Sequence, residues 1–412
     1  MKTFPSKKKT IINDPIYGFI SISDELIFRL IEHPYFQRLR RITQLGLTHL
    51  VYPGAKHTRF QHAIGAMHLM GQAIEVLRSK GHAITDEEAK AVTIAILLHD
   101  IGHGPYSHTL ENSIVEGISH EDISAIFMDK LNAEFDGELT LALKVFRDKY
   151  KKRFLHQLVS SQLDMDRLDY LRRDSFFTGV SEGVTSTERI IKMLNVVNDE
   201  LAVDYKGIYS IEKFIIARRL MYWQVYLHKT AVASEYLLLN ILKRAKEIAG
   251  NDGELFCSPV LKPFLHNHYT KKDFLKDPGL FENFAQLDDY DIMASVKAWA
   301  NHPDKILSTL SNMLVNRKLY KIEIQNSTFS KEKINKQKTK ITRKRKLKGK
   351  EAGYFVFTGT LINSAYNPQS DRINILFKDG SVKDVAEAAD LLNISMLSKA
   401  VKKYFLCYPN GL

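Results

Sequence analysis

The stretch Leu97-Leu98-His99-Asp100-Ile101-Gly102-His103-Gly104-Pro105-Tyr106-Ser107-His108 decides how the rest of this chain is interpreted. It ends an almost unbroken apolar run that starts at Ala91, and such a run predicts a buried helix. The glycines and the proline after Asp100 stop regular structure, so His99 and Asp100 lie together at the end of a buried helix. Imidazole nitrogens and carboxylate oxygens are ligands for divalent first-row metals. A buried histidine that bonds its neighbour is the alternative explanation of an isolated His-Asp pair.

Histidines gather around this stretch. Eight of the 15 histidines in the chain lie within residues 57–120, at positions 57, 62, 68, 82, 99, 103, 108 and 120. Histidine is both a common metal ligand and the side chain that exchanges protons near neutral pH. The clustering therefore favours metal binding or acid/base chemistry over isolated packing.

The length and composition are those of an ordinary globular protein. The chain has 412 residues, of which 44% are apolar and 26% charged, so it can bury a large core. Its periodicity predicts helices over residues 62–77, 86–98, 122–131, 158–174 and 208–248, and strands over residues 354–360, 373–377 and 404–408. We therefore expect a mainly α fold with a small C-terminal α+β lobe. The expected parts are a helical domain over 1–320, a basic linker or hairpin over 321–350 and the lobe over 351–412.

The positive charge is concentrated in one segment. The net charge is +12, yet residues 331–350 hold 11 lysines and arginines and the single acid Glu332, so the rest of the chain is nearly neutral. This pattern predicts a solvated, mobile hairpin or linker. A nucleic-acid arm, a subunit contact and a site for nucleotide phosphates are the alternatives.

The number of cysteines and the hydropathy of the chain indicate in which cellular compartment the protein is expected. The two cysteines, Cys257 and Cys407, are too few for a disulfide framework or a zinc knuckle, which favours a reducing cytosol. No run of about 18 uncharged apolar residues occurs. We expect a cytoplasmic protein that does not span a membrane.

Three motifs resemble those of the HD-domain phosphohydrolases. They are His57-Thr-Arg-Phe-Gln-His62, the stretch from His99 to His108, and Asp166-Arg-Leu-Asp-Tyr170-Leu-Arg-Arg-Asp174, in this order along the chain. More narrowly, the chain is similar to the dNTP triphosphohydrolases that include the mammalian sterile-alpha-motif/HD-domain enzyme. The resemblance implies a helical HD core at about residues 45–180. It also implies a metal-dependent enzyme that releases deoxynucleoside and inorganic triphosphate.

The expected metal ligands are His62, His99, Asp100 and Asp166. Two histidines and two carboxylates leave room for water or phosphate on an octahedral ion, and iron, manganese, nickel, magnesium or zinc would suit them. His103 stands where two-metal cyclic-dinucleotide phosphodiesterases of similar architecture carry lysine, which favours one divalent metal ion.

The resemblance also assigns catalytic and binding residues. His103, Glu111 and His120 fall on its acid/base positions, with Glu111 in place of the family's aspartate. The substrate-binding set is Gln44, Leu45, Arg59, His108, Arg167, Tyr170, Asp174, Arg218 and Tyr226. An activator-nucleotide site between subunits would use Asn13, Glu32, Gln37 and Arg40, and Glu32 stands where the mammalian relative reads guanine with aspartate. Ordinary salt bridges on a helix surface are the alternative for these four.

Two other functions compete with this reading. A phosphohydrolase that acts on another nucleotide or phosphoester would keep the metal but lose the cradle for a long phosphate chain. The cationic side chains at positions 59, 108, 167 and 218 argue against it. A catalytically silent nucleotide- or nucleic-acid-binding regulator is supported independently only by the basic segment. We therefore predict an enzyme that binds a nucleoside triphosphate and forms a homo-oligomer, either a dimer or a tetramer.

Overall fold

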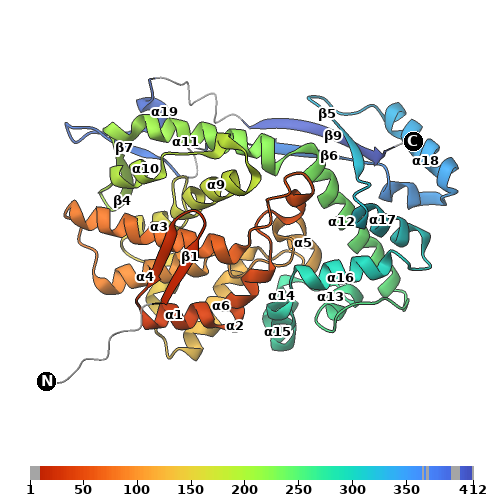
Figure 1. The fold of residues 1–412 in the computed structure, drawn as a ribbon, viewed down its shortest axis with the longest axis horizontal. Coiled ribbons are helices and arrows are strands. Elements are labelled where there is room, and N and C mark those ends of the chain that lie inside the picture. The colour runs from red at the N-terminus through yellow and green to blue at the C-terminus, as the bar shows by residue number, and fades with distance from the viewer. Residues whose placement is uncertain (1–9, 364–365, 368–370, 391–399, 411–412) are drawn as a thin grey trace.

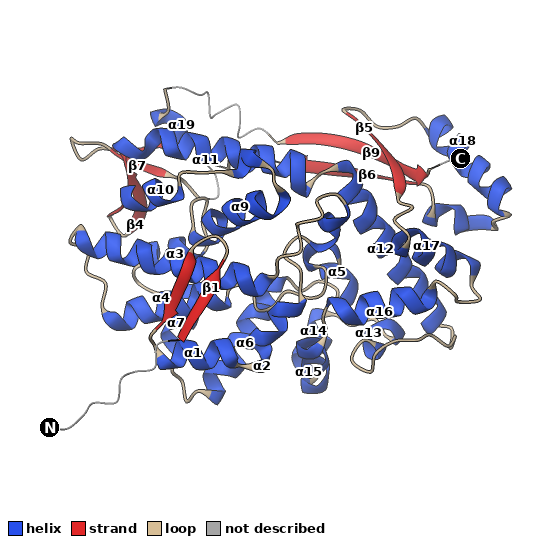
Figure 2. Ribbon diagram, viewed as in Figure 1, coloured by secondary structure: helices blue, strands red, loops and turns tan. Residues whose placement is uncertain are grey.

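The structure is a computed structural model. It describes residues 10–363, 366–367, 371–390 and 400–410, except for the side chains of residues 108, 111 and 112. Figure 2 shows a predominantly helical body with strands in three small groups. The predicted mainly α fold with strands near the C-terminus is therefore confirmed. Among the described residues, no helix combines the length and apolarity needed to cross a membrane.

Helices make up most of the body. In chain order they are α1 (Glu25–Glu32), α2 (Pro34–Gln37), α3 (Arg59–Ser79), α4 (Asp86–Leu98), α5 (Glu111–Ile114), α6 (His120–Glu134), α7 (Thr140–Phe146), α8 (Arg153–Val159), α9 (Met165–Thr178), α10 (Thr187–Met193), α11 (Ile208–Met221), α12 (Lys229–Ala249), α13 (Lys262–His266), α14 (Lys271–Lys276), α15 (Pro278–Gln286), α16 (Asp289–Trp299), α17 (Lys305–Val315), α18 (Lys331–Arg345) and α19 (Val385–Ala388). Figure 1 shows α3 in the left half of the body, where it packs against both α4 and α9.

Helix α4 forms as its sequence predicts. The side chain of Thr85 accepts a hydrogen bond from the backbone of Glu88, whose carboxylate accepts one from the backbone of Thr85. This capping box fixes the start of the helix. The residues from Ile94 to Leu98 are at most 1% exposed. The helix ends at Leu98, so the His-Asp pair leaves it from inside the core.

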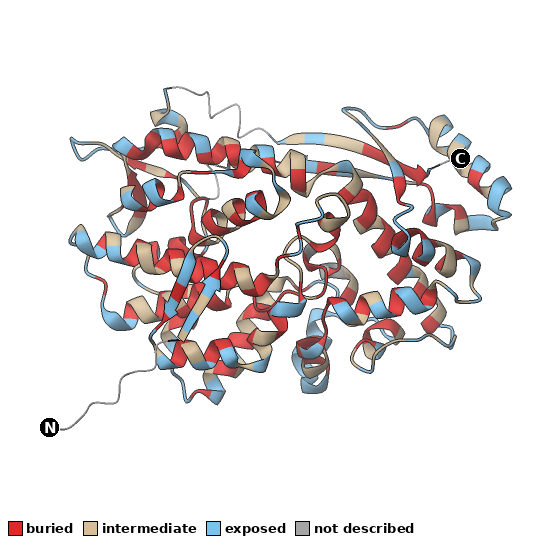
Figure 3. Ribbon diagram, viewed as in Figure 1, coloured by how far each residue is buried: buried red, intermediate tan, exposed pale blue. Residues whose placement is uncertain are grey.

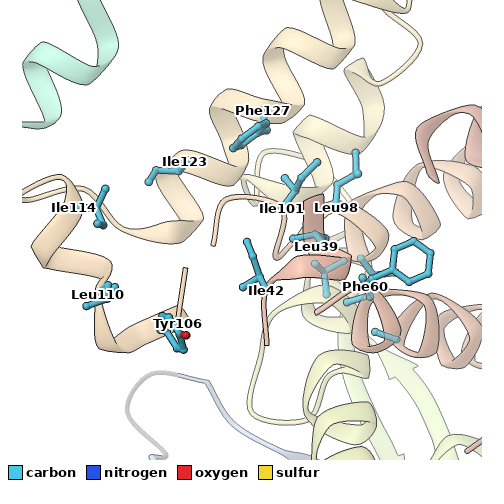
Figure 4. Close-up of a cluster of buried hydrophobic side chains, with 14 of the residues drawn as sticks. Leu39, Ile42, Phe60, Leu98, Ile101, Tyr106, Leu110, Ile114, Ile123 and Phe127 are labelled. Atoms are coloured by element: carbon cyan, nitrogen blue, oxygen red, sulfur yellow. The ribbon is translucent and has the colours of Figure 1, made fainter. Parts of the chain in front are cut away.

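The core holds the backbone on both sides of that pair. Leu98 and Ile101 are fully buried, as are Leu39 and Phe127. Figure 4 shows these side chains in one apolar cluster with Phe60 from α3. Figure 3 shows how burial differs between the helices: α3, α4 and α9 are largely buried, whereas α18 is largely exposed. Dense packing around the pair limits how far its side chains can move.

The strands form three sheets. They are β1 (Thr10–Asp14), β2 (Gly18–Ile22), β3 (Leu194–Val197), β4 (Glu200–Asp204), β5 (Tyr320–Gln325), β6 (Phe357–Asn363), β7 (Asn374–Leu376), β8 (Val382–Asp384) and β9 (Val401–Pro409). β1 and β2 make an antiparallel hairpin in which Asp14 pairs with Gly18. The other two sheets have the orders β3-β4-β7-β8 and β5-β9-β6.

The C-terminal segment shares its sheets with earlier parts of the chain. β7 runs parallel to β4, with Ile375 opposite Val203, and β9 pairs with β5, with Cys407 opposite Ile322. The last part of the chain thus adds strands to open edges of the body, which removes unpaired backbone groups from those edges.

Three predicted segments differ in the structure. The helix predicted over 158–174 is interrupted between α8 and α9, because Asp164 caps α9 by accepting from the backbone N–H of Arg167 at 2.7 Å. The helix predicted over 208–248 is divided between α11 and α12, where His228 caps the second helix. The basic segment expected as a linker or hairpin is instead largely helix α18, anchored by the fully buried Ile341.

Helix α12 carries a carboxyl group whose burial makes stability depend on pH. Burial raises the pKa of Glu235 to about 7, although a hydrogen bond with Thr109 acts in the opposite direction. The folded state then holds this proton at a higher pH than the unfolded chain. The contribution of this proton to the free energy of unfolding is complete below about pH 4.5 and is lost as the pH rises through about 7.

Glu235→Gln removes this loss, because the amide resembles the neutral acid in shape. We expect the variant to melt at a higher temperature than the wild type at pH 8 and at nearly the same temperature at pH 4. Thermal unfolding followed by circular dichroism measures both. Glu254→Gln, at an exposed position, is the control. Equal melting temperatures of wild type and Glu235→Gln at pH 8 would contradict the assignment.

Candidate metal centre

Four side chains that lie far apart in the sequence meet at one point. His62 projects from α3, His99 and Asp100 follow α4, and Asp166 lies in the first turn of α9. Nε2 of His62 lies 3.1 Å from Oδ1 of Asp166 and 3.4 Å from Nε2 of His99. Oδ2 of Asp100 lies 3.7 Å from the same nitrogen of His62. The structure thus brings the four predicted metal ligands together.

Their spacing is that of ligands around one cation. Ligand atoms about 2.1 Å from a metal lie about 3.0 Å apart at a right angle and about 3.4 Å apart at the tetrahedral angle. Nε2 of His99 lies 3.5 Å from Oδ1 of Asp166 and 3.4 Å from Oδ1 of Asp100. The set therefore needs little rearrangement to hold an ion.

Hydrogen bonds behind the two imidazoles fix which nitrogen faces the centre. Nδ1 of His99 lies 2.6 Å from the carbonyl oxygen of Ile96, and Nδ1 of His62 lies 2.8 Å from Oδ2 of Asp169. Carbonyl and carboxylate oxygens only accept, so each Nδ1 carries a hydrogen, and Nε2 of each ring faces the centre, where it would offer its lone pair to a metal once its own proton has left. Two lone pairs and two carboxylates then face one point, which is unfavourable in a buried site unless a cation lies there. This donor set fits a divalent metal.

The electrostatics of the centre favour positive charge. Burial opposes a charged imidazole at His62, but hydrogen bonds with Asp166 and Asp169 raise its pKa to about 10. Burial also opposes charge on His99, and Asp100 and Asp166 nevertheless raise its pKa. The pKa of Asp166 stays well below its ordinary value because, against burial, both imidazoles donate to it. A metal ion would supply the charge that these carboxylates stabilise.

A second group of side chains adjoins the first. Nε2 of His103 lies 3.3 Å from Oδ1 of Asp100, and the rings of His103 and His120 are stacked with centroids 3.9 Å apart. Burial, and then the charge of Arg59, holds the pKa of His103 well below its ordinary value. Two residues of the predicted acid/base set are thus placed beside the candidate metal ligands. The third, Glu111, begins α5, and its side chain lies outside the described residues.

Each arginine expected to bind phosphate has a protein partner. Arg59 forms an ion pair with Asp100 and donates from Nε to Oγ of Ser107 at 2.8 Å. Arg167 pairs with Asp164, and Arg218 donates to Oε1 of Gln162 at 2.9 Å. The side chain of His108 lies outside the described residues.

Several polar atoms of the expected substrate-binding set remain unsatisfied. Among the residues that the structure describes, Nε of Arg167, Nε of Arg218 and Oε1 of Gln44 are buried without a hydrogen-bond partner. Buried polar atoms in this state are costly and usually mark a missing ligand or water. Leu45, beside Gln44, is half-buried.

Asp174 is the hub of a buried hydrogen-bond group. Its Oδ1 lies 2.7 Å from Nε2 of His57, and its Oδ2 accepts from the hydroxyl of Tyr226 at 2.8 Å. The ring of Tyr170 packs edge-on against Tyr226. Three expected substrate contacts are therefore adjacent. His57, which the sequence offers only as part of a motif, stacks on Phe177 and orients Asp174.

The four residues of the expected activator site are only partly gathered. Asn13 and Arg40 line a cavity of about 300 Å³ beside the β1–β2 hairpin. Gln37 is outside the lining but accepts from Nε of Arg40 at 2.8 Å, and Arg40 lies over the ring of Phe60. Glu32 is exposed at the end of α1 and does not line the cavity.

Asp169 is a residue of the candidate site that the sequence analysis did not single out. It lies one turn after Asp166 on α9, is fully buried, and accepts from His62. A signal existed, because histidines that bind metals usually donate their other N–H to a carboxylate or carbonyl. The sequence could not say which of the acids on α9 serves as ligand and which as support.

Comparisons with known proteins agree with this geometry. The HD domain family model matches residues 59–174, and the model of the HD associated region matches residues 186–255. The Bacillus subtilis protein YwfO is 30% identical to this chain, over 98% of this chain and 93% of the relative. A deoxynucleoside triphosphate triphosphohydrolase SAMHD1 homolog from Dictyostelium discoideum is 32% identical, over 58% of this chain and 50% of the relative.

A solved structure is similar over the full length. The crystal structure of a phosphohydrolase from Bacteroides thetaiotaomicron has a TM-score of 0.95 and 55% sequence identity, covering 98% of this chain and 100% of the other. The matched HD region begins at Arg59 and ends at Asp174, so it contains every predicted metal ligand. The chain belongs to the HD-domain phosphohydrolases, a superfamily of metal-dependent enzymes.

Proposed function

We propose that the protein is a dNTP triphosphohydrolase that releases deoxynucleoside and inorganic triphosphate. The convergence of the four proposed ligands beside His103, together with unsatisfied nitrogens on Arg167 and Arg218, is the observation that carries this proposal. The names of relatives such as the Dictyostelium SAMHD1 homolog support the same substrate class. A phosphomonoesterase would have little use for so many cationic groups.

His62, His99, Asp100 and Asp166 would hold one divalent ion, which when bound lowers the pKa of water and polarises phosphoryl oxygens. The chain's own residues do the rest. Arg59, Arg167 and Arg218 neutralise the triphosphate, and their guanidinium groups suit paired phosphate oxygens. His103, held between Asp100 and the ring of His120, starts as a neutral ring, so it would accept the proton that the attacking water loses and pass it to the leaving 5′ oxygen. Glu111 is proposed to orient this acid/base pair.

The proposed sugar pocket consists of Gln44, Leu45, Tyr170, Asp174 and Tyr226. Asp174 is fixed by His57 and Tyr226, so its carboxylate is ready to accept a hydrogen bond from a sugar hydroxyl. A packed leucine beside this group would disfavour the additional hydroxyl of a ribonucleotide. We also propose that the protein forms a homo-oligomer with an activator-nucleotide site between its subunits. Light scattering measures the molar mass with and without dNTP and so tests both the oligomer and its dependence on nucleotide.

The decisive experiment identifies the products. Chelated and desalted protein is supplied with Fe²⁺, Mn²⁺, Ni²⁺, Mg²⁺ or Zn²⁺ and incubated with each dNTP and NTP, and anion exchange separates triphosphate from single phosphate. Equal amounts of nucleoside and triphosphate, formed from dNTPs in preference to NTPs, support the proposal. Release of single phosphates would assign another phosphohydrolase activity. No hydrolysis with any metal would favour a silent regulator.

A further inference from the structure

A line of buried charged groups starts at the metal ligand His62 and leads away from the centre. Behind its Nδ1 lies Asp169, at 2.8 Å, and both side chains are fully buried. The two oxygens of Asp169 also accept from the guanidinium of Arg173, so the acid is paired with a fixed cation. Asp169 is thus a carboxylate that holds the hydrogen of Nδ1 in place.

Arg173 connects Asp169 to the N-terminal hairpin. Its Nε and Nη2 donate to the two oxygens of Asp169 at 2.9 and 3.0 Å, and its Nη1 donates to Oδ2 of Asp14 at 2.8 Å. The other oxygen of Asp14 accepts from the backbone N–H groups of Ile16 and Tyr17, at 2.8 and 3.1 Å. The guanidinium is therefore held at three nitrogens, and the line ends in the turn between β1 and β2.

The surrounding helix is shaped to admit this pair. A Cβ atom on Gly65 of α3 would lie 2.1 Å from Oδ1 of Asp169 and 2.2 Å from Nη2 of Arg173. On the other side, the ring of Tyr17 lies 5.6 Å from the guanidinium carbon of Arg173. The pair thus lies in a closed space between α3, α9 and the hairpin, where any larger residue at position 65 would displace it.

We propose that Asp169, Arg173 and Asp14 are positioning residues that set the tautomer and orientation of His62 and so couple the metal centre to the β1–β2 hairpin. This inference rests on the proposed metal site. It deepens that site, because Asp14 also lines the 300 Å³ cavity beside the hairpin. A shift of the hairpin at that cavity would reach His62 through three consecutive ionic hydrogen bonds.

Binding of Co²⁺ to the metal-free protein tests the inference without relying on activity. Calorimetry gives the dissociation constant, and the visible absorption of bound Co²⁺ reports its coordination. Asp169→Asn is expected to weaken Co²⁺ binding by about 10–100-fold, the usual effect of losing such a supporting group, and to alter the spectrum. Asp14→Asn is expected to act in the same direction by a smaller factor.

The control is Asp304→Asn, which removes the charge from the Arg244–Asp304 ion pair and keeps an oxygen that can cap α17. It should lower the melting temperature and leave Co²⁺ affinity unchanged. If Asp169→Asn and Asp14→Asn lowered only the melting temperature, the three residues would be structural and the inference would fail. If the wild type bound no Co²⁺, the proposed metal site itself would fail.

A pair of glycine variants in α3 tests the same inference without changing any charge. Gly65→Ala is expected to displace the Asp169–Arg173 pair and to weaken Co²⁺ binding about tenfold or more. Gly71→Ala, in the same helix with nothing within 4 Å of the added carbon, should bind Co²⁺ like the wild type. Equal affinities of the two variants would overturn the inference, even if Asp169→Asn failed to fold.

Discussion

Asp166→Asn is expected to reduce hydrolysis by at least about 10³-fold, because several kcal/mol of charge stabilisation are lost with the metal. The carboxylate of Asp166 approaches both Nε2 atoms, at 3.1 Å from His62 and 3.5 Å from His99. An amide at this position removes the negative charge that balances the cation. Single-turnover hydrolysis and the metal content of the purified protein, measured by mass spectrometry, should fall together.

The control for this variant is Asp129→Asn on α6, which removes an exposed ion pair between Asp129 and Arg147. It should retain full metal content and activity, and circular dichroism should show that both variants are folded. An Asp166→Asn protein that kept its metal and hydrolysed dNTPs at the wild-type rate would remove α9 from the proposed active site.

His103→Gln is expected to lower kcat by about 10²–10⁴-fold while metal affinity stays near that of the wild type. His103 contacts Asp100, at 3.3 Å from its Oδ1, and is not one of the four proposed ligands, so its loss removes a proton donor and no proposed ligand. The measurement is kcat and KM for the preferred dNTP, together with Co²⁺ affinity.

The leaving group provides the internal control for this role. A 5′ oxygen needs a proton as it departs, whereas a p-nitrophenolate leaves without one. The variant should therefore lose much less activity on a p-nitrophenyl phosphodiester than on a dNTP. Equal losses on both substrates would mean that His103 supports the centre in some other way than by donating a proton.

Local sequence signals specified individual elements well. The capping box of Thr85 and Glu88 fixes the start of α4, and Ser119 caps α6, because both signals act within four residues. Predicted continuous helices failed where a cap inside the segment outweighed the apolar periodicity, as at Asp164 between α8 and α9. Periodicity alone does not reveal such competition between neighbouring signals.

Local sequence signals do not predict which strands pair when they lie far apart in the chain. Strand β7 of the C-terminal segment joins β4, so Ile375 lies opposite Val203. Neither strand contains information about its partner, since main-chain hydrogen bonding is the same for any pair of edges. The division of the chain into parts therefore depends on contacts that no short segment encodes.

The predicted ligand types follow from local sequence alone, because the apolar run through Leu98 is buried and is followed directly by His99 and Asp100. The roles of the acids on α9 depend instead on how the helices pack. With α3 packed against α9, Asp166 faces the Nε2 side of His62, whereas Asp169 lies behind its Nδ1. Residues on one helix differ in role because a neighbouring helix presents two different faces of the same imidazole, and that relation exists only after the helices have packed.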